Sequence, residues 1–337
     1  MERAPHLVLE GLMIGCYAVG AARGYVFLRS EYARAAETMQ RAIDEARQAG
    51  LIGENIRGSG CSIDVVIRNG AGAYISGEET GLLESTEGKR GWPRQKPPFP
   101  ARKGLFGRPT TVNNVETLAC VPLVVSAGGK AFAAVGSPGN TGPKLYCLSG
   151  HVRNPGVFES PMTVTLRDLV FLDRFGGGTA GDRGLKAVIP GGSSAKVLRA
   201  DEVDVIADFD HLAEAGSMLG SAGVIVMDDR TCMVRAAANT ARFFDHETCG
   251  QCTPCREGCH WIRLVLDRVE AGRGRDEDVA LVLERLAAIG EQTICPFGQA
   301  VAWGVGGIVA KFRDEFLEHN RLGRCPRPAW DFAEERR

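Results

Sequence analysis

The sequence predicts a chain of mixed class, with an α/β layer first, a small mixed β domain next and a helical bundle last. Helix and strand patterns alternate near the N-terminus, which is typical of a mostly parallel sheet covered by helices. From Asp229 onward, apolar residues recur at helical spacing in four successive stretches, the pattern of a four-helix bundle. We expect these three parts to span residues 1–139, 140–228 and 229–325, followed by a tail over 326–337.

Composition narrows the class of protein. The 337 residues suffice for two or three domains, and an apolar content of 44% supports buried cores. A formal net charge of −1 argues against a nucleic-acid-binding protein, which normally carries a basic excess. Eleven cysteines fit a reducing compartment, where thiols bind metal, better than a secreted disulfide framework. The apolar stretch 7–28 contains Glu10 and Arg23, so we interpret it as a buried helix and strand rather than a membrane span or signal peptide.

The first part is expected to alternate helices and strands. A helix over residues 5–20 precedes a buried strand over 25–28. An amphipathic helix follows, capped by Ser30, stopped by Gly50 and burying one face of apolar side chains, Ala35, Met39, Ile43 and Ala46. A second strand then carries three alternating apolar residues, Ile63, Val65 and Ile67.

Directly after this strand lies the glycine-rich stretch NGAGAYISGEETGLLESTEG, residues 69–88. Three of its glycines allow close approach of a ligand to the backbone, Gly70, Gly72 and Gly77. A helix is expected to begin near Glu78, and a glycine-rich turn that leads into a helix N-terminus can bind an anion or a cofactor. The same stretch can also be a tight connection, with Glu78 and Glu79 as ordinary first-turn acids.

A loop rich in proline, lysine and arginine follows over residues 89–109. Its prolines exclude regular structure and favour an extended chain. It is either a solvated basic linker or a loop that places Lys96 and Phe99 over a phosphate-bearing ligand. A helix is expected over 115–127.

The middle part then begins with a linker over 137–143 and continues with a hairpin formed by 144–152 and 156–159. A helix over 166–172 and strands over 187–189 and 223–227 complete it.

The cysteine pattern is the strongest indication of chemistry. CGQCTPCREG at 249–258 provides three thiols at i, i+3 and i+6, and TICPFG at 293–298 provides a fourth. Four thiolates are the ligand set of cubane iron–sulfur clusters, whereas zinc more often uses two separated CxxC pairs. Unmetallated cysteines are the third alternative. The triple should start the second bundle helix and the fourth thiol should lie between the third and fourth helices, so that one end of the bundle gathers Cys249, Cys252, Cys255 and Cys295.

With these motifs in view, the chain resembles the NADH-binding flavoprotein subunit of respiratory complex I. Related subunits of NAD-linked hydrogenases and formate dehydrogenases share much of the pattern. The resemblance covers nearly the whole chain and rests on six segments: GAGAYISGEETGLLES at 70–85, EGKRGWPRQKPPFP at 87–100, TTVNNVETL at 110–118, AVIPGGSSAKVL at 187–198, GSMLGSAGVIVMDD at 216–229 and CGQCTPCREG at 249–258.

The resemblance implies a Rossmann-like domain that holds FMN, a β-grasp module and a helical bundle with one [4Fe–4S] cluster. NADH would pass a hydride to the flavin, and electrons would leave singly through the cluster. The four cysteines named above would ligate the cluster. The flavin and nicotinamide site would comprise the catalytic residue Glu79 together with Gly77 and Glu78, the NADH contacts Lys96 and Phe99, and the FMN contacts Val112, Asn113 and Asn114.

The resemblance also implies a small [2Fe–2S] subunit and a large multi-cluster subunit as partners. The chain would be cytoplasmic and would reach the inner membrane only through these neighbours, with no membrane insertion of its own. Family members carry a glycine- and phenylalanine-rich flavin loop and an acidic motif upstream of the point where this chain starts. We therefore expect an N-terminally shortened version with an incomplete flavin site.

Two other functions remain open from the sequence. One is a flavin-free electron-transfer or scaffolding piece that keeps its cluster, and the other is a zinc-stabilised structural protein. Cys259 lies four residues after Cys255 and is an alternative ligand, although we expect a buried helical thiol.

Overall fold

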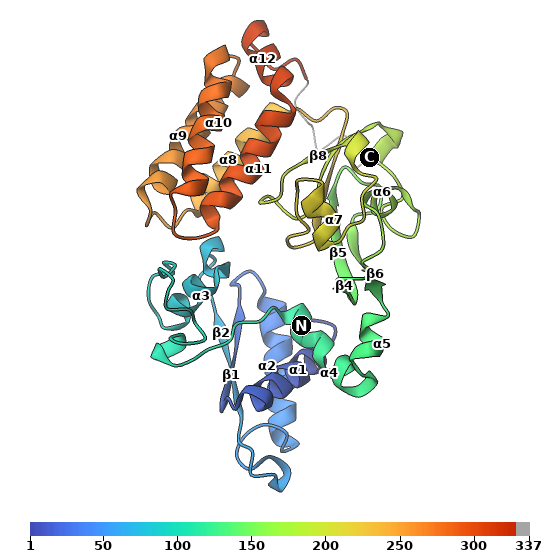
Figure 1. Cartoon of the computed structure of the whole chain (residues 1–337), viewed down its shortest axis with the longest axis vertical. Coiled ribbons are helices and arrows are strands. Elements are labelled where there is room, and N and C mark those ends of the chain that lie inside the picture. The colour runs from blue at the N-terminus through green and yellow to red at the C-terminus, as the bar shows by residue number, and fades with distance from the viewer. Residues whose placement is uncertain (328–337) are drawn as a thin grey trace. The chain divides into compact units, whose positions relative to one another are not determined.

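The computed structural model describes residues 1–327, so most of the tail expected over 326–337 lies outside the described residues (Figure 1). The chain divides into two compact units, one over Met1–Phe132 and a second that begins at Ala133. Each unit is described by itself. Within residues 1–327, no helix combines the length and the apolar character that crossing a bilayer requires.

The first unit is built on two parallel strands that pair in register from Arg23 opposite Asp64 to Leu28 opposite Asn69. The predicted alternation of helices and strands and the parallel pairing are therefore confirmed. The elements of this unit are α1 (Pro5–Val19), β1 (Arg23–Leu28), α2 (Ala33–Gln48), η1 (Ile56–Gly58), β2 (Asp64–Asn69), η2 (Tyr74–Gly77), α3 (Glu79–Thr86), η3 (Leu105–Gly107) and α4 (Val115–Ala127), with α5 (Gly129–Ala133) at its border.

The core of the first unit lies where α1 and α2 meet the strands. The predicted apolar face of α2 is buried, and Met39 and Ile43 are almost completely inaccessible. The predicted start of α2 was wrong, because the helix begins at Ala33 with Tyr32 in the N-cap position. Ser30 does not cap it, since its hydroxyl donates to the carboxylate of Glu31 at 3.3 Å instead.

Helix α1 packs closely against α4 at one glycine. A methyl group added at Gly11 would lie 1.8 Å from the carbonyl oxygen of Leu118, so only a residue without a side chain fits there. One turn further along α1, a methyl group at Gly15 would meet the nearest atom, a side-chain carbon of Leu118, at 3.8 Å, which is ordinary contact. Gly11 therefore excludes any larger residue, whereas Gly15 in the same helix has room for a methyl group.

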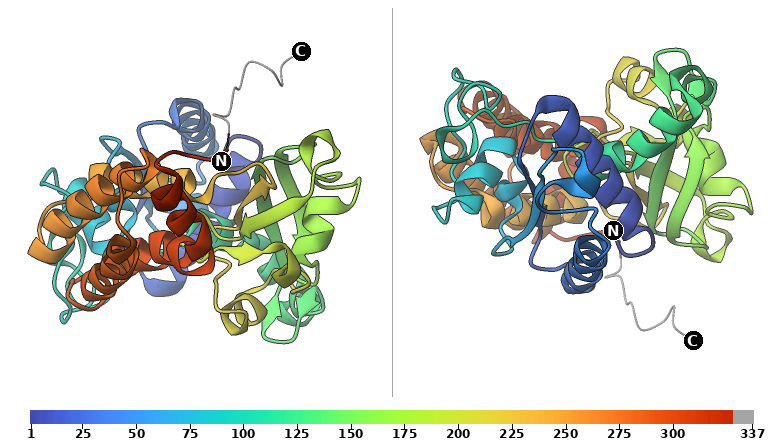
Figure 2. Two further views of the ribbon diagram at one scale, coloured as in Figure 1. Left: turned by 90° about the horizontal axis from the view of Figure 1, so that it is seen from above. Right: turned by 90° about the horizontal axis from the view of Figure 1, so that it is seen from below.

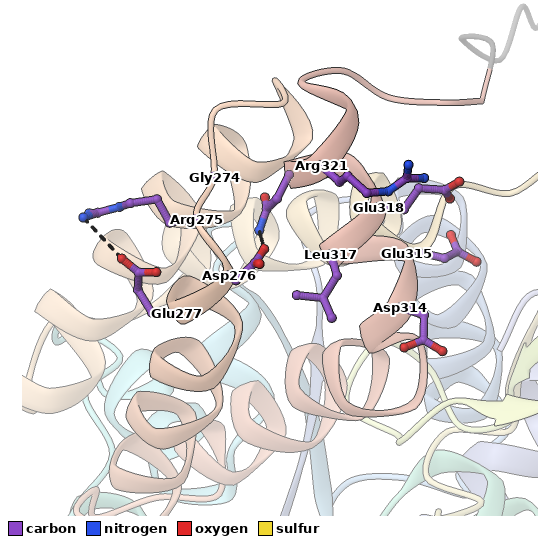
Figure 3. A pocket seen from close by; sticks show the side chains of 10 residues that line it. Gly274, Arg275, Asp276, Glu277, Asp314, Glu315, Leu317, Glu318 and Arg321 are labelled. Carbon is purple, nitrogen blue, oxygen red and sulfur yellow. Dashed lines mark hydrogen bonds and ion pairs between the residues drawn. The ribbon is translucent and has the colours of Figure 1, made fainter.

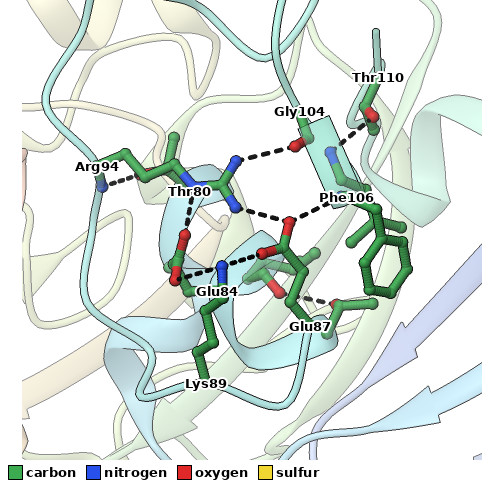
Figure 4. A network of polar contacts seen from close by, with 12 residues as sticks. Thr80, Glu84, Glu87, Lys89, Arg94, Gly104, Phe106 and Thr110 are labelled. Carbon is green, nitrogen blue, oxygen red and sulfur yellow. Dashed lines mark hydrogen bonds and ion pairs between the residues drawn. The ribbon is translucent and has the colours of Figure 1, made fainter. Parts of the chain in front are cut away.

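A polar network centred on Arg94 holds the proline-rich loop against α3 (Figure 4). The Arg94 guanidinium donates to Glu84 at 2.5 Å, to Glu87 at 2.8 Å and to the carbonyl oxygen of Gly104 at 3.0 Å. Glu87 also accepts from the backbone N–H of Phe106 at 2.7 Å. Burial alone would raise the pKa of Glu87, but Lys89, Arg94 and the Phe106 amide together lower it. The expected extended loop is confirmed, and its path is set by this ionised network.

The second unit contains a five-stranded sheet in the order β6-β5-β9-β7-β8. Strands β5 and β9 run parallel, and the other neighbours are antiparallel. The predicted hairpin, helix and two further strands are confirmed. The elements are β3 (Gly136–Ser137), β4 (Asn140–Thr141), β5 (Pro143–Gly150), β6 (Gly156–Pro161), α6 (Leu166–Phe171), η4 (Ala180–Asp182), β7 (Leu185–Ile189), β8 (Leu198–Arg199), η5 (Ala200–Glu202), α7 (Phe209–Glu214) and β9 (Gly223–Asp228).

The expected linker over 137–143 was wrong. Residues Gly136–Ser137 and Asn140–Thr141 pair as a small antiparallel hairpin. Two ties fix this hairpin to the start of α7: the Ser137 hydroxyl donates to Asp208 at 3.0 Å, and the Asn140 amide donates to Asp210 at 2.8 Å. The glycines and proline therefore shape a turn rather than a free connection.

Helices complete the second unit, and Figure 2 shows them (orange to red) beside the sheet (green). Four of them pack as neighbours in the pairs α8·α9, α9·α10, α10·α11 and α11·α8. The predicted stripes on α8 to α10 are largely buried, including Ile262, Leu266 and Val282. The helices are α8 (Met233–Glu247), α9 (Thr253–Glu270), α10 (Asp276–Glu291), α11 (Phe297–Lys311) and α12 (Arg313–Leu322).

The prediction of a single fourth helix was wrong, because the chain breaks at Phe312 between α11 and α12. The Arg199 guanidinium, from the sheet, donates to the carbonyl oxygen of Lys311 and also lies over the Phe312 ring, with 5.5 Å between its Cζ and the ring centroid. Helix α11 also passes close to the loop between β7 and β8 at Gly304, where a methyl group would lie 2.1 Å from the carbonyl oxygen of Ser193. Arg199 thus contacts the chain at the point where α11 ends.

We predict that Gly11→Ala destabilises the first unit by about 1–3 kcal/mol, because the added methyl group must push α1 away from the backbone of α4. Gly15→Ala is the matched control. It should leave stability unchanged or raise it by up to about 1 kcal/mol, since alanine favours a helix more than glycine does. Hydrogen exchange of the α1 amides measures both effects. Equal protection in the two variants would contradict the close packing at Gly11.

We also predict that Arg94→Met loosens the loop over residues 89–109. Glu84 and Glu87 would lose a shared cation, which should lower the free energy of local opening by about 1–3 kcal/mol. Hydrogen exchange of the Phe106 amide reports this opening. Arg90→Met removes the same charge from an exposed arginine stacked on Trp92 and should leave the exchange rate nearly unchanged.

Candidate functional site

The N-terminus of α3 brings three of the predicted site residues together. Glu78 is the N-cap, and its carboxylate accepts hydrogen bonds from the backbone N–H groups of Thr80 at 2.9 Å and Gly81 at 2.8 Å. The Lys96 ammonium forms an ion pair with Glu79 and lies 3.4 Å from the second oxygen of Glu78. A residue of the proline-rich loop is thereby placed directly over the start of a helix that follows the glycine-rich turn.

Lys96, Gly77 and Phe99 are the features of this helix start that bear on ligand binding. Burial alone would lower the pKa of Lys96, but Glu79 and Glu78 raise it, so the side chain is a firmly held cation. Gly77 opens onto free space, since a methyl group built there would meet no atom within 4 Å. Phe99, on the same loop as Lys96, is 60% exposed. A lysine for a phosphate, an exposed ring for stacking and a bare glycine fit a flavin or a nicotinamide nucleotide.

The remaining predicted flavin contacts lie just before α4. Asn114 is the N-cap of this helix, and its side-chain oxygen accepts from the backbone N–H of Glu116 at 2.8 Å. That oxygen is therefore engaged in capping, and the amide nitrogen is the part of Asn114 that suits a ligand. Val112 and Asn113 are exposed. Sequence reasoning placed the helix start correctly but did not anticipate that Asn114 caps it.

The cluster cysteines lie at helix starts, as predicted. Cys252 is the N-cap of α9 and Cys255 lies in its first turn, while Cys295 directly precedes Pro296, the N-cap of α11. The turn between Cys249 and Cys252 needs a glycine, because Gly250 has a φ of +76°. Arg256 braces this turn by donating to the carbonyl oxygen of Gly250 at 2.8 Å.

Packing shows that the two cysteine loops lie at the same end of the bundle. Gly258, one turn after Cys255, lies against Ile289 of α10, where an added methyl group would come within 2.6 Å of the isoleucine. The ring of Phe297, at the start of α11, packs on Phe244, near the end of α8, with ring centroids 5.5 Å apart. The N-termini of α9 and α11 therefore meet at this end, and their dipoles favour a negatively charged group such as a thiolate-ligated cluster.

Contacts among the thiols separate Cys255 from Cys259. Their sulfurs lie 3.9 Å apart, and the Thr248 hydroxyl lies 3.1 Å from the sulfur of Cys255. A hydrogen bond from the Cys259 thiol lowers the pKa of Cys255 to about 7, while the same bond and burial raise the pKa of Cys259. Cys259 lies within α9, and its side chain is buried. This arrangement supports the interpretation of Cys259 as a buried helical thiol.

A second group of metal-ligating side chains lies apart from the predicted cluster ligands. One tetrahedral zinc ion would hold its sulfurs about 3.8 Å apart. Within residues 1–327, the metal-ligating side chains whose donor atoms all lie within 4.8 Å of one another belong to a different group, Cys232, Glu270, His319 and Cys325. Sequence reasoning missed this group because it draws on three segments that are far apart in the chain. Its one local signal is the pair of ligand types in HNRLGRC at 319–325.

The bundle also carries an open hollow of about 830 Å³ between the start of α10 and α12 (Figure 3). Charged side chains dominate its lining, and the Asn320 amide donates to Asp276 across it at 3.3 Å. It contains none of the site residues predicted from the sequence. We therefore attribute it to the imperfect packing of a short helix against a longer one.

Three family models match the chain. The Nuo51 FMN-binding domain matches residues 1–123, the SLBB domain matches residues 144–226, and the NADH-ubiquinone oxidoreductase-F iron-sulfur binding region matches residues 235–319. Among solved structures, a chain of the NAD+-reducing [NiFe]-hydrogenase in the H2-reduced state aligns with a TM-score of 0.85 and 33% identity. That alignment covers 99% of this chain and 55% of the hydrogenase chain, so this chain spans just over half of it.

Curated relatives are more similar in sequence. The F 2 subunit of NADH-quinone oxidoreductase from Rhizobium meliloti (strain 1021) is 51% identical over 97% of this chain and 77% of its own length. The F subunit of NADH-quinone oxidoreductase from Rhodobacter capsulatus is 47% identical over 97% of this chain and 76% of its own length. Together with the site geometry, this similarity shows that the chain belongs to the family of NADH-quinone oxidoreductase F subunits.

Proposed function

We propose that this chain is an electron-input subunit that oxidises NADH with the help of FMN and passes single electrons to a [4Fe–4S] cluster. The observation that carries the proposal is the gathering of two cysteine loops at the paired N-termini of α9 and α11, in a chain of the F-subunit family. FMN, when bound, supplies the step between hydride transfer and single-electron transfer.

The three matched regions support a division of labour along the chain. Residues 1–139 would form the Rossmann-like domain for FMN and NADH, residues 140–228 a β-grasp module and residues 229–325 the cluster bundle. The match of the FMN-binding family model over residues 1–123 argues against the flavin-free alternative. The match of the iron-sulfur family model over residues 235–319 argues against the alternative of a zinc-stabilised protein at that site.

Residues at the start of α3 would bind and orient the nucleotide. Lys96 is the mobile partner, because it can exchange Glu79 for a phosphate while Glu78 stays fixed in the helix cap. Glu79 would then be freed toward the nicotinamide, which makes it the candidate for positioning the reacting ring. Gly77 keeps the approach open, and Phe99 offers a face for stacking.

Four cysteines would hold the cluster. Cys249, Cys252 and Cys255 would bind three corners from the start of α9, and Cys295 would bind the fourth from the start of α11. The flavin itself would rest against the loop before α4, with Val112, Asn113 and the amide nitrogen of Asn114 as contacts. We further propose that the chain works in a peripheral arm on the cytoplasmic side of the inner membrane, with a small [2Fe–2S] subunit and a large multi-cluster subunit as neighbours.

The nucleotide role predicts a specific defect in Lys96→Gln. The Michaelis constant for NADH should rise by about tenfold or more, the value of one charge-assisted hydrogen bond, with kcat largely unchanged. NADH oxidation with an artificial electron acceptor, in the FMN-loaded complex, measures this effect. Lys103→Gln removes the same charge from an exposed position on the same loop and serves as the control. Equal kinetics in the two variants would contradict the role of Lys96.

The cluster role predicts that Cys295→Ser lowers iron and sulfide content by about tenfold, whereas Cys259→Ser retains both, because only the first removes a ligand. Elemental analysis and the brown absorbance of the anaerobically purified protein measure the result. Iron loss in Cys259→Ser with full retention in Cys295→Ser would reverse the assignment. Zinc in place of iron, lost with Cys295→Ser, would refute the redox function altogether.

A further inference from the structure

Four metal-ligating side chains meet at the opposite end of the bundle from the cluster cysteines. Cys232 is the N-cap of α8, Glu270 is the last residue of α9, His319 lies in α12, and Cys325 lies in the segment after α12. Because α9 rises about 1.5 Å per residue, Glu270 lies about 26 Å along the helix from Thr253, which follows the cluster ligand Cys252. The group is therefore separate from the iron–sulfur ligands.

The distances within this group match those around one tetrahedral metal ion. A zinc ion with bonds of about 2.3 Å to sulfur and 2.0–2.1 Å to nitrogen holds two sulfurs about 3.8 Å apart and a sulfur and a nitrogen about 3.5 Å apart. The Cys232 and Cys325 sulfurs lie 3.7 Å apart, and the Cys232 sulfur lies 3.4 Å from Nε2 of His319. The nearer carboxylate oxygen of Glu270 lies 3.7 Å from the Cys232 sulfur and 3.6 Å from that nitrogen.

The histidine is oriented as a metal ligand should be. Nδ1 of His319 lies 2.7 Å from the carbonyl oxygen of Glu315, one turn earlier in α12. A carbonyl oxygen only accepts hydrogen bonds, so Nδ1 carries the proton and Nε2 is the nitrogen directed at the two sulfurs. The ring is fully buried, and Cys232 is buried beside it.

Arg235 supplies the charge balance that a buried ion needs. Its Nε donates to the second oxygen of Glu270 at 2.8 Å, and its Nη2 lies 3.8 Å from the Cys325 sulfur. Its backbone N–H donates to the Cys232 sulfur at 3.4 Å. Two thiolates and one carboxylate around a divalent ion carry one net negative charge, and the guanidinium neutralises it. Such neighbours also orient the ligands, as outer-shell partners do at known zinc sites.

We propose that Cys232, Glu270, His319 and Cys325 bind a single zinc ion as a closed structural site. Two thiolates, an imidazole and a carboxylate suit zinc better than calcium or magnesium, and four protein ligands leave no position for a substrate. The ion ties the start of α8 and the end of α9 to α12 and to the segment that follows it. This inference does not depend on the proposed electron-transfer function.

The same contacts allow two other states that the experiment must distinguish. The sulfurs of Cys232 and Cys325 are close enough for a small movement to form a disulfide. Alternatively, the four side chains form a metal-free cluster of hydrogen bonds. Mass spectrometry of the alkylated protein under non-reducing conditions detects the first state. Elemental analysis after exposure to zinc and removal of unbound metal detects the second.

The test measures zinc and iron separately in the anaerobically purified full chain. Wild type should hold one zinc ion, with an X-ray absorption spectrum fitted by two sulfur and two nitrogen or oxygen ligands. Cys325→Ser should lower zinc content by about tenfold or more and leave iron unchanged. Cys147→Ser, at an exposed position on the sheet, is the control and should keep both metals.

A milder variant keeps the result informative if Cys325→Ser fails to fold. Glu270→Gln preserves size and shape but removes the anionic ligand, so zinc should exchange with a chelator about tenfold faster or more, while retained iron reports a folded bundle. A wild-type chain that takes up no zinc would overturn the proposal. So would zinc that is lost in Cys295→Ser but kept in Cys325→Ser, or a disulfide between Cys232 and Cys325.

Discussion

The direction in which each helix runs is the constraint on which the second unit depends. Neighbouring helices joined by short connections must alternate in direction, so every second connection falls at the same end. The connection between α8 and α9 and the connection between α10 and α11 therefore share one end, and both carry cysteines. Helix N-termini at that end supply partial positive charge where thiolates gather. The order and direction of the helices are therefore enough to bring the two cysteine-bearing connections to one end of the bundle.

In the first unit, most of the proline-rich loop over residues 89–109 has no regular structure. Backbone groups in such a loop need partners, and side chains provide them here. Arg94 and Glu87 bond to the loop backbone, and α3 supplies the carboxylates that anchor the arginine. This anchoring of the loop also fixes the position of Lys96. Arg94, which is not expected to contact a ligand, therefore helps to position Lys96, which is expected to bind one.

Patterns along the chain predicted most helices and strands, because their apolar periodicity reflects burial directly. Patterns could not predict events decided by distant residues. One such event is the hydrogen bond that Arg199, at the end of β8, donates to the carbonyl oxygen of Lys311, the last residue of α11. Residue type also failed to predict that Ser30 bonds to its neighbour Glu31 instead of capping α2. The cysteines proposed as cluster ligands were recognisable from the sequence since three of them are local. The zinc ligands were not, because Cys232 and Cys325 are 93 positions apart in the sequence.

The close contact between Gly304 of α11 and the carbonyl of Ser193 has a consequence for how such chains diversify. Family models treat the sheet region and the bundle as separate modules, over residues 144–226 and 235–319. In space the two regions share an interface, the seam, in which Gly304 lies too close to Ser193 for any side chain to fit. An ion pair between Lys311 and Glu202 at 2.5 Å belongs to the same interface. Recombination that exchanged one module alone would have to preserve this seam. The sheet region and the bundle of this chain therefore fit each other at the level of the backbone.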